Sequence, residues 1–133
     1  MRVVVDTNVL ISGVYFGGMP YRVLEAWRDG KFDLVFSPEI LEEYRRVGEK
    51  LEAQFTEVSL APFLALLVMN AEIVEASELA EQVSRDPDDD KFVSCAIKGG
   101  CQFIVSGDKD LLDISGYRGV KVVTPREFFE SVL

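Results

Sequence analysis

"RVVVD", residues 2–6, is the stretch that decides the fold of this chain. Three consecutive valines are typical of a short strand that is buried on both faces, as in a parallel sheet. Open parallel sheets carry their functional side chains at the carboxyl ends of the strands. Asp6 stands at that end of the run and is therefore the first candidate functional residue.

The rest of the chain alternates short strand-like runs with longer helical patterns. We expect further strands at 32–36, 72–76, 101–106 and 120–124. Helices are predicted at 21–30, 37–53, 56–71, 77–83, 86–100 and 124–133. The helix at 56–71 is mostly apolar and is expected to be buried. Strands separated by helices predict an α/β fold with a parallel sheet that helices cover on both faces.

Three of the predicted helices begin with a capping residue followed by proline: Ser37-Pro38, Asp86-Pro87 and Thr124-Pro125. The capping oxygen accepts a free backbone N–H of the first turn, and proline fits the first helical position because it has no N–H to lose. Gly99 and Gly100 are expected to end the helix at 86–100.

Length and composition predict one globular domain. The chain has 133 residues, of which 48% are hydrophobic and 28% charged, so residues 1–133 can bury a core without a disulfide or a metal. No signal peptide is recognisable, and the longest apolar stretch, "SLAPFLALLVMNA", is too short to span a bilayer. We therefore expect a cytoplasmic protein with no membrane partner.

The chain contains no histidine and only two cysteines. This excludes Ser-His-Asp and Cys-His catalysis and disfavours zinc. Cys95 and Cys101 lie in apolar surroundings and are interpreted as small buried hydrophobic residues. Any catalysis would therefore depend mainly on carboxylates. The net charge of −9 argues against nucleic-acid binding unless divalent cations reverse the local sign.

Two aspartates stand at the ends of predicted strands. Asp6 follows the first run, and Asp108 follows the run at 101–106. Each has a simpler interpretation as well. Asp6 could be a helix cap, and Asp108 lies in "SGDKD", which is good turn chemistry. Together they indicate an acidic site at one edge of the sheet.

The acidic stretch "DPDDDKF" (86–92) can be divided by helical phase. Asp86 is the expected cap, and Asp88 would stabilise the positive end of the helix dipole. Asp89 precedes the apolar residues by three, four and seven positions, so it faces the buried side of the helix. A carboxylate in that place must be paired or bind a metal. Asp90 lies at the edge of the apolar stripe, and no role is assigned to it.

The helix at 37–53 offers a similar choice between two glutamates. Glu43 follows Ile40 by three positions and precedes Val47 by four, so it lies at the edge of the apolar stripe. Glu42 faces water, where Arg45 or Arg46 could pair with it. Glu43 is therefore the candidate site residue on this helix.

Four acids converge in this interpretation: Asp6, Glu43, Asp89 and Asp108. Oxygen-only sites suit hard cations, above all Mg²⁺ or Mn²⁺. Such ions support phosphoryl chemistry without histidine. The charge of the chain is thus compatible with a phosphate-containing substrate.

Four motifs in order, "VVVDTNVLIS", "SPEILEEY", "DPDDDKFVSCA" and "IVSGDKDLL", resemble PIN domains, in particular the single-domain proteins related to VapC toxins. The resemblance covers nearly the whole chain. It implies a three-layer α/β/α fold with a mainly parallel sheet, and Mg²⁺- or Mn²⁺-dependent cleavage of single-stranded RNA. It also implies a toxin that pairs with a small antitoxin protein and forms a homodimer.

The family's acidic set falls on the same residues, namely Asp6, Glu43, Asp89 and Asp108. Asn8 matches an auxiliary polar position, Asp110 a frequent fifth acid, and Ser106 a position that often holds Thr or Ser. The basic residues near these acids in the sequence are candidates for phosphate contacts, although each could be an ordinary solvated charge: Arg45, Arg46, Lys91 and Lys109.

The sequence patterns also bear on functions other than a nuclease. A calcium loop counted from Asp86 would need Gly and Glu where Lys91 and Ile97 stand, so it is excluded. A magnesium-dependent phosphatase would need a second acid at the position of Asn8. A phosphoacceptor receiver domain would need an early acidic pair. A PIN fold that only binds RNA or protein, without catalysis, remains the main alternative.

Overall fold

The computed structural model describes residues 1–133 and is built around a five-stranded parallel sheet. The strands are β1 (Arg2–Val5), β2 (Asp33–Phe36), β3 (Glu72–Ile73), β4 (Phe103–Val105) and β5 (Lys121–Val123). Their order across the sheet is β3-β2-β1-β4-β5, so the valine strand β1 is central. All four pairings are parallel. The predicted parallel α/β sheet is confirmed.

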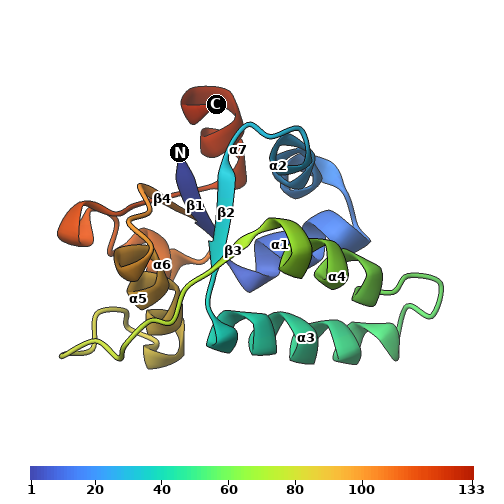
Figure 1. Ribbon diagram of the computed structural model, residues 1–133, viewed down its shortest axis with the longest axis horizontal. Coiled ribbons are helices and arrows are strands. Elements are labelled where there is room, and N and C mark those ends of the chain that lie inside the picture. Colours follow the sequence, from blue (N-terminus) through green and yellow to red (C-terminus); the bar gives the residue numbers. More distant parts are fainter.

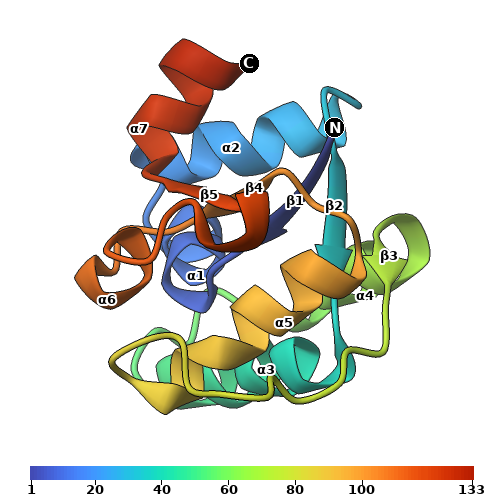
Figure 2. The ribbon, with the colours of Figure 1, turned by 90° about the vertical axis from the view of Figure 1, so that its left-hand side faces the viewer.

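Helices flank the sheet on both sides, which gives three layers (Figure 1). They are α1 (Thr7–Tyr15), α2 (Gly18–Arg28), α3 (Pro38–Glu52), α4 (Ala61–Asn70), α5 (Asp90–Lys98), α6 (Lys109–Leu112) and α7 (Pro125–Glu127). Short 3₁₀ turns are η1 (Pro87–Asp89) and η2 (Tyr117–Gly119), and η3 (Phe128–Val132) is a wider π turn after α7. Figure 2 shows α5 below the strands and α2 and α7 above them.

The core is centred on β1. Val3, Val4 and Val5 are fully buried, as expected of a strand covered on both faces. The Tyr44 hydroxyl, on α3, donates a hydrogen bond to the Val5 carbonyl, which ties α3 to the end of β1. Cys95 and Cys101 are buried free thiols, and burial is the main cause that raises their pKa values to about 12 and about 11. Their interpretation as buried small residues is confirmed.

The three predicted caps are present. The Ser37 hydroxyl accepts from the Ile40 N–H at 3.3 Å, Asp86 accepts from Asp88 at 3.0 Å, and Thr124 accepts from Glu127 at 3.1 Å. The helix predicted at 86–100 begins differently from the expectation, because its first turn is the 3₁₀ turn η1 and regular α5 starts at Asp90.

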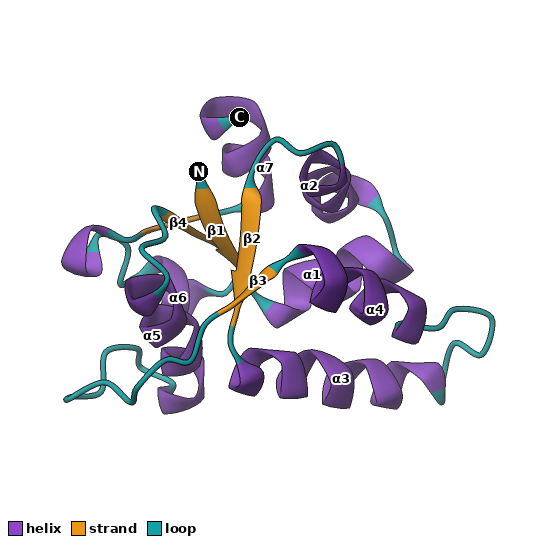
Figure 3. Ribbon diagram, viewed as in Figure 1, coloured by secondary structure: helices purple, strands orange, loops and turns teal.

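The prediction of a helix at 77–83 is wrong. This segment belongs to an irregular connection between β3 and η1, which Figure 3 shows in teal. The Asp90 carboxylate fixes the end of the connection, because it accepts hydrogen bonds from the Val83 N–H at 3.0 Å and the Ser84 N–H at 2.7 Å. These two backbone groups are thus held by a side chain six and seven positions further along the chain and not by a helix.

The helix at 56–71 is shorter and more exposed than expected. Within α4 only Leu67 is buried, whereas Leu66, Val68 and Met69 are 55%, 54% and 80% exposed. The expectation of a buried helix is therefore wrong. An apolar helix can be recognised from its composition, but composition does not say whether the same chain supplies a neighbour for each face. We find no helix long and apolar enough to cross a bilayer.

The structure also contains α1, which the sequence patterns do not predict. Five of its nine residues are buried: Thr7, Val9, Leu10, Ile11 and Gly13. A helix buried on several sides has no clear polar face, so it lacks the amphipathic period that reveals most helices. Its position directly after Asp6 matters for the site, because its first residues lie at the carboxyl end of β1.

Candidate metal centre

The carboxyl ends of β1 and β4 bring the first acids together. The two strands pair in parallel with Val5 opposite Val105, and the Asp6 N–H donates to the Val105 carbonyl at 2.9 Å. The chain leaves β4 through Ser106 and reaches Asp108 at the start of α6. Asp6 and Asp108 are therefore neighbours, although about a hundred residues separate them in the sequence.

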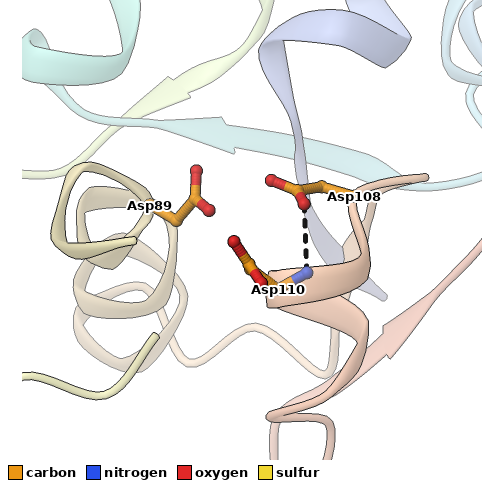
Figure 4. A group of neighbouring side chains, drawn as sticks. All are labelled: Asp89, Asp108 and Asp110. Carbon is orange, nitrogen blue, oxygen red and sulfur yellow. Dashed lines mark hydrogen bonds between the residues drawn. The ribbon is translucent and has the colours of Figure 1, made fainter. Parts of the chain in front are cut away.

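Three carboxylates form the tightest acidic group in the protein. Oxygens of Asp89, Asp108 and Asp110 lie within 4.8 Å of one another, and all three side chains are partly buried. Figure 4 shows them pointing toward a common point from η1 and the start of α6. Asp108 also caps α6, because its Oδ1 accepts the Asp110 N–H at 3.0 Å. This cap holds Asp108 and Asp110 in a fixed relation, and we call the three residues the aspartate trio.

Asp89 is the least satisfied member of the trio. Its Oδ2 is buried and has no hydrogen-bond partner. Burial, followed by the close approach of the Asp108 carboxylate and the charges of Asp108, Asp86 and Asp6, raises the pKa of Asp89 to about 7. A buried carboxylate oxygen without a partner is rare in native proteins and needs an explanation such as a bound ion.

Asp6 lies beside the trio and has a different partner. The Ser106 hydroxyl donates to Asp6 Oδ2 at 2.6 Å, while the same hydroxyl oxygen accepts the Asp108 N–H at 2.9 Å. Burial raises the pKa of Asp6; the Ser106 hydrogen bond opposes this, and the charges of Asp108 and Glu43 add to it. Ser106 thus links the ends of β1 and β4.

Glu43 is held by other residues of the chain. Its Oε1 accepts from Lys91 Nζ at 2.8 Å, its Oε2 accepts from the Thr7 hydroxyl, and Arg46 lies 3.8 Å from Oε1. The Glu43 side chain is 12% exposed and that of Lys91 is 18% exposed. Burial opposes the charged lysine, but the hydrogen bond and charge of Glu43 and the charge of Asp88 raise the pKa of Lys91. We call Glu43, Lys91 and Thr7 the glutamate corner.

Three other predicted site residues, Asn8, Lys109 and Arg45, have no hydrogen bond or ion pair with the aspartate trio or with Glu43. Asn8 is exposed on α1 and lines a shallow hollow together with Asp108 and Lys109. The Lys109 ammonium is exposed and pairs with Asp113 at 2.8 Å. The Arg45 guanidinium pairs with Glu42 and Glu49, both at 2.6 Å, on the solvent side of α3. The expected pairing of Glu42 with an arginine is confirmed, and it turns Arg45 away from Glu43.

Two contacts at the site could not be read from the sequence. Thr7 received no role, although it directly follows the strand-end Asp6, and that position alone places it at the carboxyl edge of the sheet. Lys91 was expected only to contact phosphate, whereas it pairs with Glu43. Asp90, for which the sequence suggested no role, fixes the connection before η1 as described above.

The aspartate trio fits a small hard cation. The atoms that could bind a metal ion are all carboxylate oxygens, the ligands that Mg²⁺ and Mn²⁺ prefer. Ligands of Mg²⁺ stand about 2.1 Å from the ion and so at most about 4.2 Å apart, which oxygens within 4.8 Å of one another reach after a small side-chain movement. The partnerless Oδ2 of Asp89 is the atom that such an ion would satisfy. Asp6 and Glu43 already hold partners from the chain.

Comparison with known proteins places these observations in a family. The complex of VapBC2 from Rickettsia felis bound to a DNA fragment from their promoter contains a chain of similar fold, with a TM-score of 0.60 and 15% identity. The match covers 92% of this chain and 97% of that chain, and at this identity it shows the fold. No curated protein sequence matches. A family model described as PIN domain matches residues 2–110, from β1 to Asp110. The chain therefore belongs to the PIN-domain family.

Proposed function

We propose that this protein is a Mg²⁺- or Mn²⁺-dependent endoribonuclease that hydrolyses phosphodiester bonds of single-stranded RNA. The observation that carries the proposal is the aspartate trio at the carboxyl edge of the sheet, with the buried, partnerless Oδ2 of Asp89. Membership of the PIN-domain family supports nuclease chemistry. The absence of histidine is compatible with it, because a metal-dependent site of this kind needs only oxygen ligands.

In this proposal each acid has a distinct task. Asp89, Asp108 and Asp110 would hold the metal ion. When bound, the ion would polarise a phosphate oxygen and lower the pKa of a water molecule. Asp6, oriented by Ser106, faces the trio from the end of β1 and adds negative charge that favours a cation there. Thr7 and Lys91 fix the Glu43 carboxylate at the other side of the site.

The substrate must approach a protein of net charge −9. A bound divalent ion would reverse the charge locally, and Arg46 stands within 3.8 Å of Glu43 with its side chain half exposed. Arg46 is therefore the best placed of the four basic candidates to contact a phosphate, and the exposed Lys109 and Asn8 line a hollow together with Asp108. Single-stranded RNA fits this proposal, because its flexible backbone can reach an acidic site at a sheet edge.

We further propose that the protein is the toxin of a toxin–antitoxin pair and acts in the cytoplasm. The similar solved fold is that of a VapBC2 complex, which supports a small protein partner. The exposed apolar side chains of α4, Leu66, Val68 and Met69, supply a surface on which an antitoxin or a second copy of the chain could pack. A homodimer remains part of this proposal.

A PIN fold that only binds RNA or protein is the alternative. It has no need of a buried carboxylate oxygen without a partner, which costs stability unless a ligand compensates it. The phosphatase alternative is less suited to the site, because the position where it needs a second acid holds the exposed Asn8.

The proposal is tested by incubating purified protein with a single-stranded RNA of mixed sequence. We expect cleavage with Mn²⁺ or Mg²⁺, none with excess chelator, and slower cleavage in Asp6→Asn. Full activity in Asp6→Asn would contradict the proposed site, and RNA binding without cleavage in the wild type would favour the binding module. A readout independent of activity is the melting temperature, which Mg²⁺ should raise more in the wild type than in Asp89→Ala.

A further inference from the structure

Lys91 occupies an unusual place for a lysine. It lies in the first turn of α5, where the helix dipole disfavours a positive charge. Only 18% of its side chain is exposed. Lysine is rarely buried to this extent without a partner. Here the Nζ atom lies 2.8 Å from Glu43 Oε1 and 3.4 Å from Asp88 Oδ1. The ammonium is thus held inside the acidic site, and Glu43 is its main partner.

The two sides of the site therefore differ in how their charge is compensated. Both oxygens of Glu43 have donors from the chain, Lys91 at Oε1 and Thr7 at Oε2. In the aspartate trio, Asp89 Oδ2 has no donor, and no basic residue pairs with Asp108 or Asp110. The chain supplies a cation at the glutamate corner and leaves the trio without one.

A divalent ion at the glutamate corner would have to compete with this ammonium. To reach Glu43 Oε1 it must displace Lys91 Nζ, which the stem of the side chain keeps close by. The displaced ammonium would repel the ion at short range in a partly buried site, where water screens the repulsion only in part.

We propose that Lys91 is a positioning residue that takes the place of a second divalent ion, so that the chain binds a single ion at the aspartate trio. This inference rests on the proposed function, since it concerns the same metal centre. It goes further by stating how many ions the site takes and which residue sets that number. Lys91 acts through Glu43. It holds the carboxylate in position and occupies Oε1, so that a metal ion cannot bind this oxygen.

The experiment counts Mn²⁺ bound per chain in metal-stripped full-length protein, by equilibrium dialysis against increasing Mn²⁺. We expect one ion in the wild type and a second ion in Lys91→Met, which removes the 2.8 Å partner of Glu43 Oε1 and leaves only Arg46, at 3.8 Å. Lys91→Arg keeps the charge and should return the count to one. Lys98→Met is the matched control, because Lys98 is an exposed lysine at the other end of α5 and its loss should leave the count at one.

A double variant, Lys91→Met with Glu43→Gln, shows whether Glu43 holds the second ion. It removes both charges of the pair, should fold without an uncompensated carboxylate, and should bind one ion. Thermal melts monitored by circular dichroism provide a second measurement, in which Mn²⁺ should raise the melting temperature of Lys91→Met more than that of Lys98→Met.

The outcomes separate this inference from the proposed function. Two ions in the wild type, or one ion in both the wild type and Lys91→Met, would overturn the role of Lys91 and leave the metal centre standing. A second ion that persists in the double variant would overturn the role of Glu43. No bound Mn²⁺ in the wild type would overturn the proposed metal centre and this inference together.

Discussion

The aspartate trio and the glutamate corner lie side by side, yet the chain treats them differently. Glu43 receives hydrogen bonds from Lys91 and Thr7, so this acid is compensated without any ligand. The trio brings three carboxylates within 4.8 Å, and the buried Oδ2 of Asp89 has no partner. Residues of the same chemical type thus have different tasks because their neighbours differ. The corner has a cationic partner within the chain, while no basic side chain of the chain pairs with the trio.

The same contrast separates two adjacent residues at the start of α5. Asp89 points into the trio, whereas both oxygens of Asp90 accept backbone N–H groups of Val83 and Ser84. Asp89 costs stability in the absence of a ligand, and Asp90 contributes stability by satisfying two backbone donors. Substitutions at the two positions should therefore have opposite consequences.

The largest effect is expected from Asp108→Asn. Asparagine caps α6 as well as aspartate does, so the fold should be kept. The loss of one carboxylate from the trio should lower the rate of RNA cleavage in Mn²⁺ by about 100-fold or more. The control is Asp113→Asn, because Asp113 is an exposed acid at the end of the same helix that pairs with Lys109. Cleavage at the wild-type rate in Asp108→Asn would contradict the assignment of the trio.

The pH dependence of the melting temperature, compared between the wild type and Asp89→Asn, tests how much the partnerless carboxylate destabilises the fold. The pKa of folded Asp89 is about 7, above the ordinary value of 3.8, so the fold favours the protonated form. The contribution to stability is therefore fully present below about pH 4 and is lost as the pH rises through 7. In chelator, the wild type should lose melting temperature between pH 4.5 and pH 8 relative to Asp89→Asn. A difference in melting temperature that stays constant across this range would show that ionisation of Asp89 does not destabilise the fold.

Much of the fold follows from local signals. The valines of β1 and the caps at Ser37, Asp86 and Thr124 act over a few residues, so the sequence displays them directly. The exposure of α4 and the irregular segment 77–83 depend on what packs against them. No local pattern contains that information, and both expectations there were wrong.

In the candidate site too, local patterns predict some residues, whereas contacts between distant parts of the chain are not predictable. Asp6 and Asp108 follow from strand ends, and Asp89 from helical phase, because sheet direction and helix period fix where a side chain points. The partners of Glu43 do not follow, since Thr7 is 36 positions and Lys91 is 48 positions away along the chain. Whether an acid is compensated is a tertiary property, and it is the property that distinguishes the trio from the corner.

Asp90→Ala should destabilise the fold without removing a member of the trio. The N–H groups of Val83 and Ser84 would lose their acceptor, which costs about 1–3 kcal/mol of unfolding free energy. The measurement is urea denaturation in chelator, followed by Mn²⁺ dialysis of the folded variant. Asp88→Ala is the comparison. The Asp88 carboxylate is exposed and its one partner is Lys91, so the loss of this ion pair should lower the free energy of unfolding by about 0.5 kcal/mol. An equal cost for both variants would contradict the assigned role of Asp90.

The smallest expected effect distinguishes two arginines of α3. Arg45 is paired with Glu42 and Glu49 on the solvent side, whereas Arg46 lies 3.8 Å from Glu43 with half of its side chain free. If Arg46 contacts a phosphate, Arg46→Ala should reduce the slope of log affinity for single-stranded RNA against log salt by about 0.7. The binding is measured in Ca²⁺, with a second series in chelator, to avoid cleavage. Arg45→Ala should leave the slope unchanged, because its loss removes only solvent-exposed ion pairs with Glu42 and Glu49. The same change of slope in both variants would mean that RNA follows the whole solvent face of α3, and that proximity to the glutamate corner does not select its path.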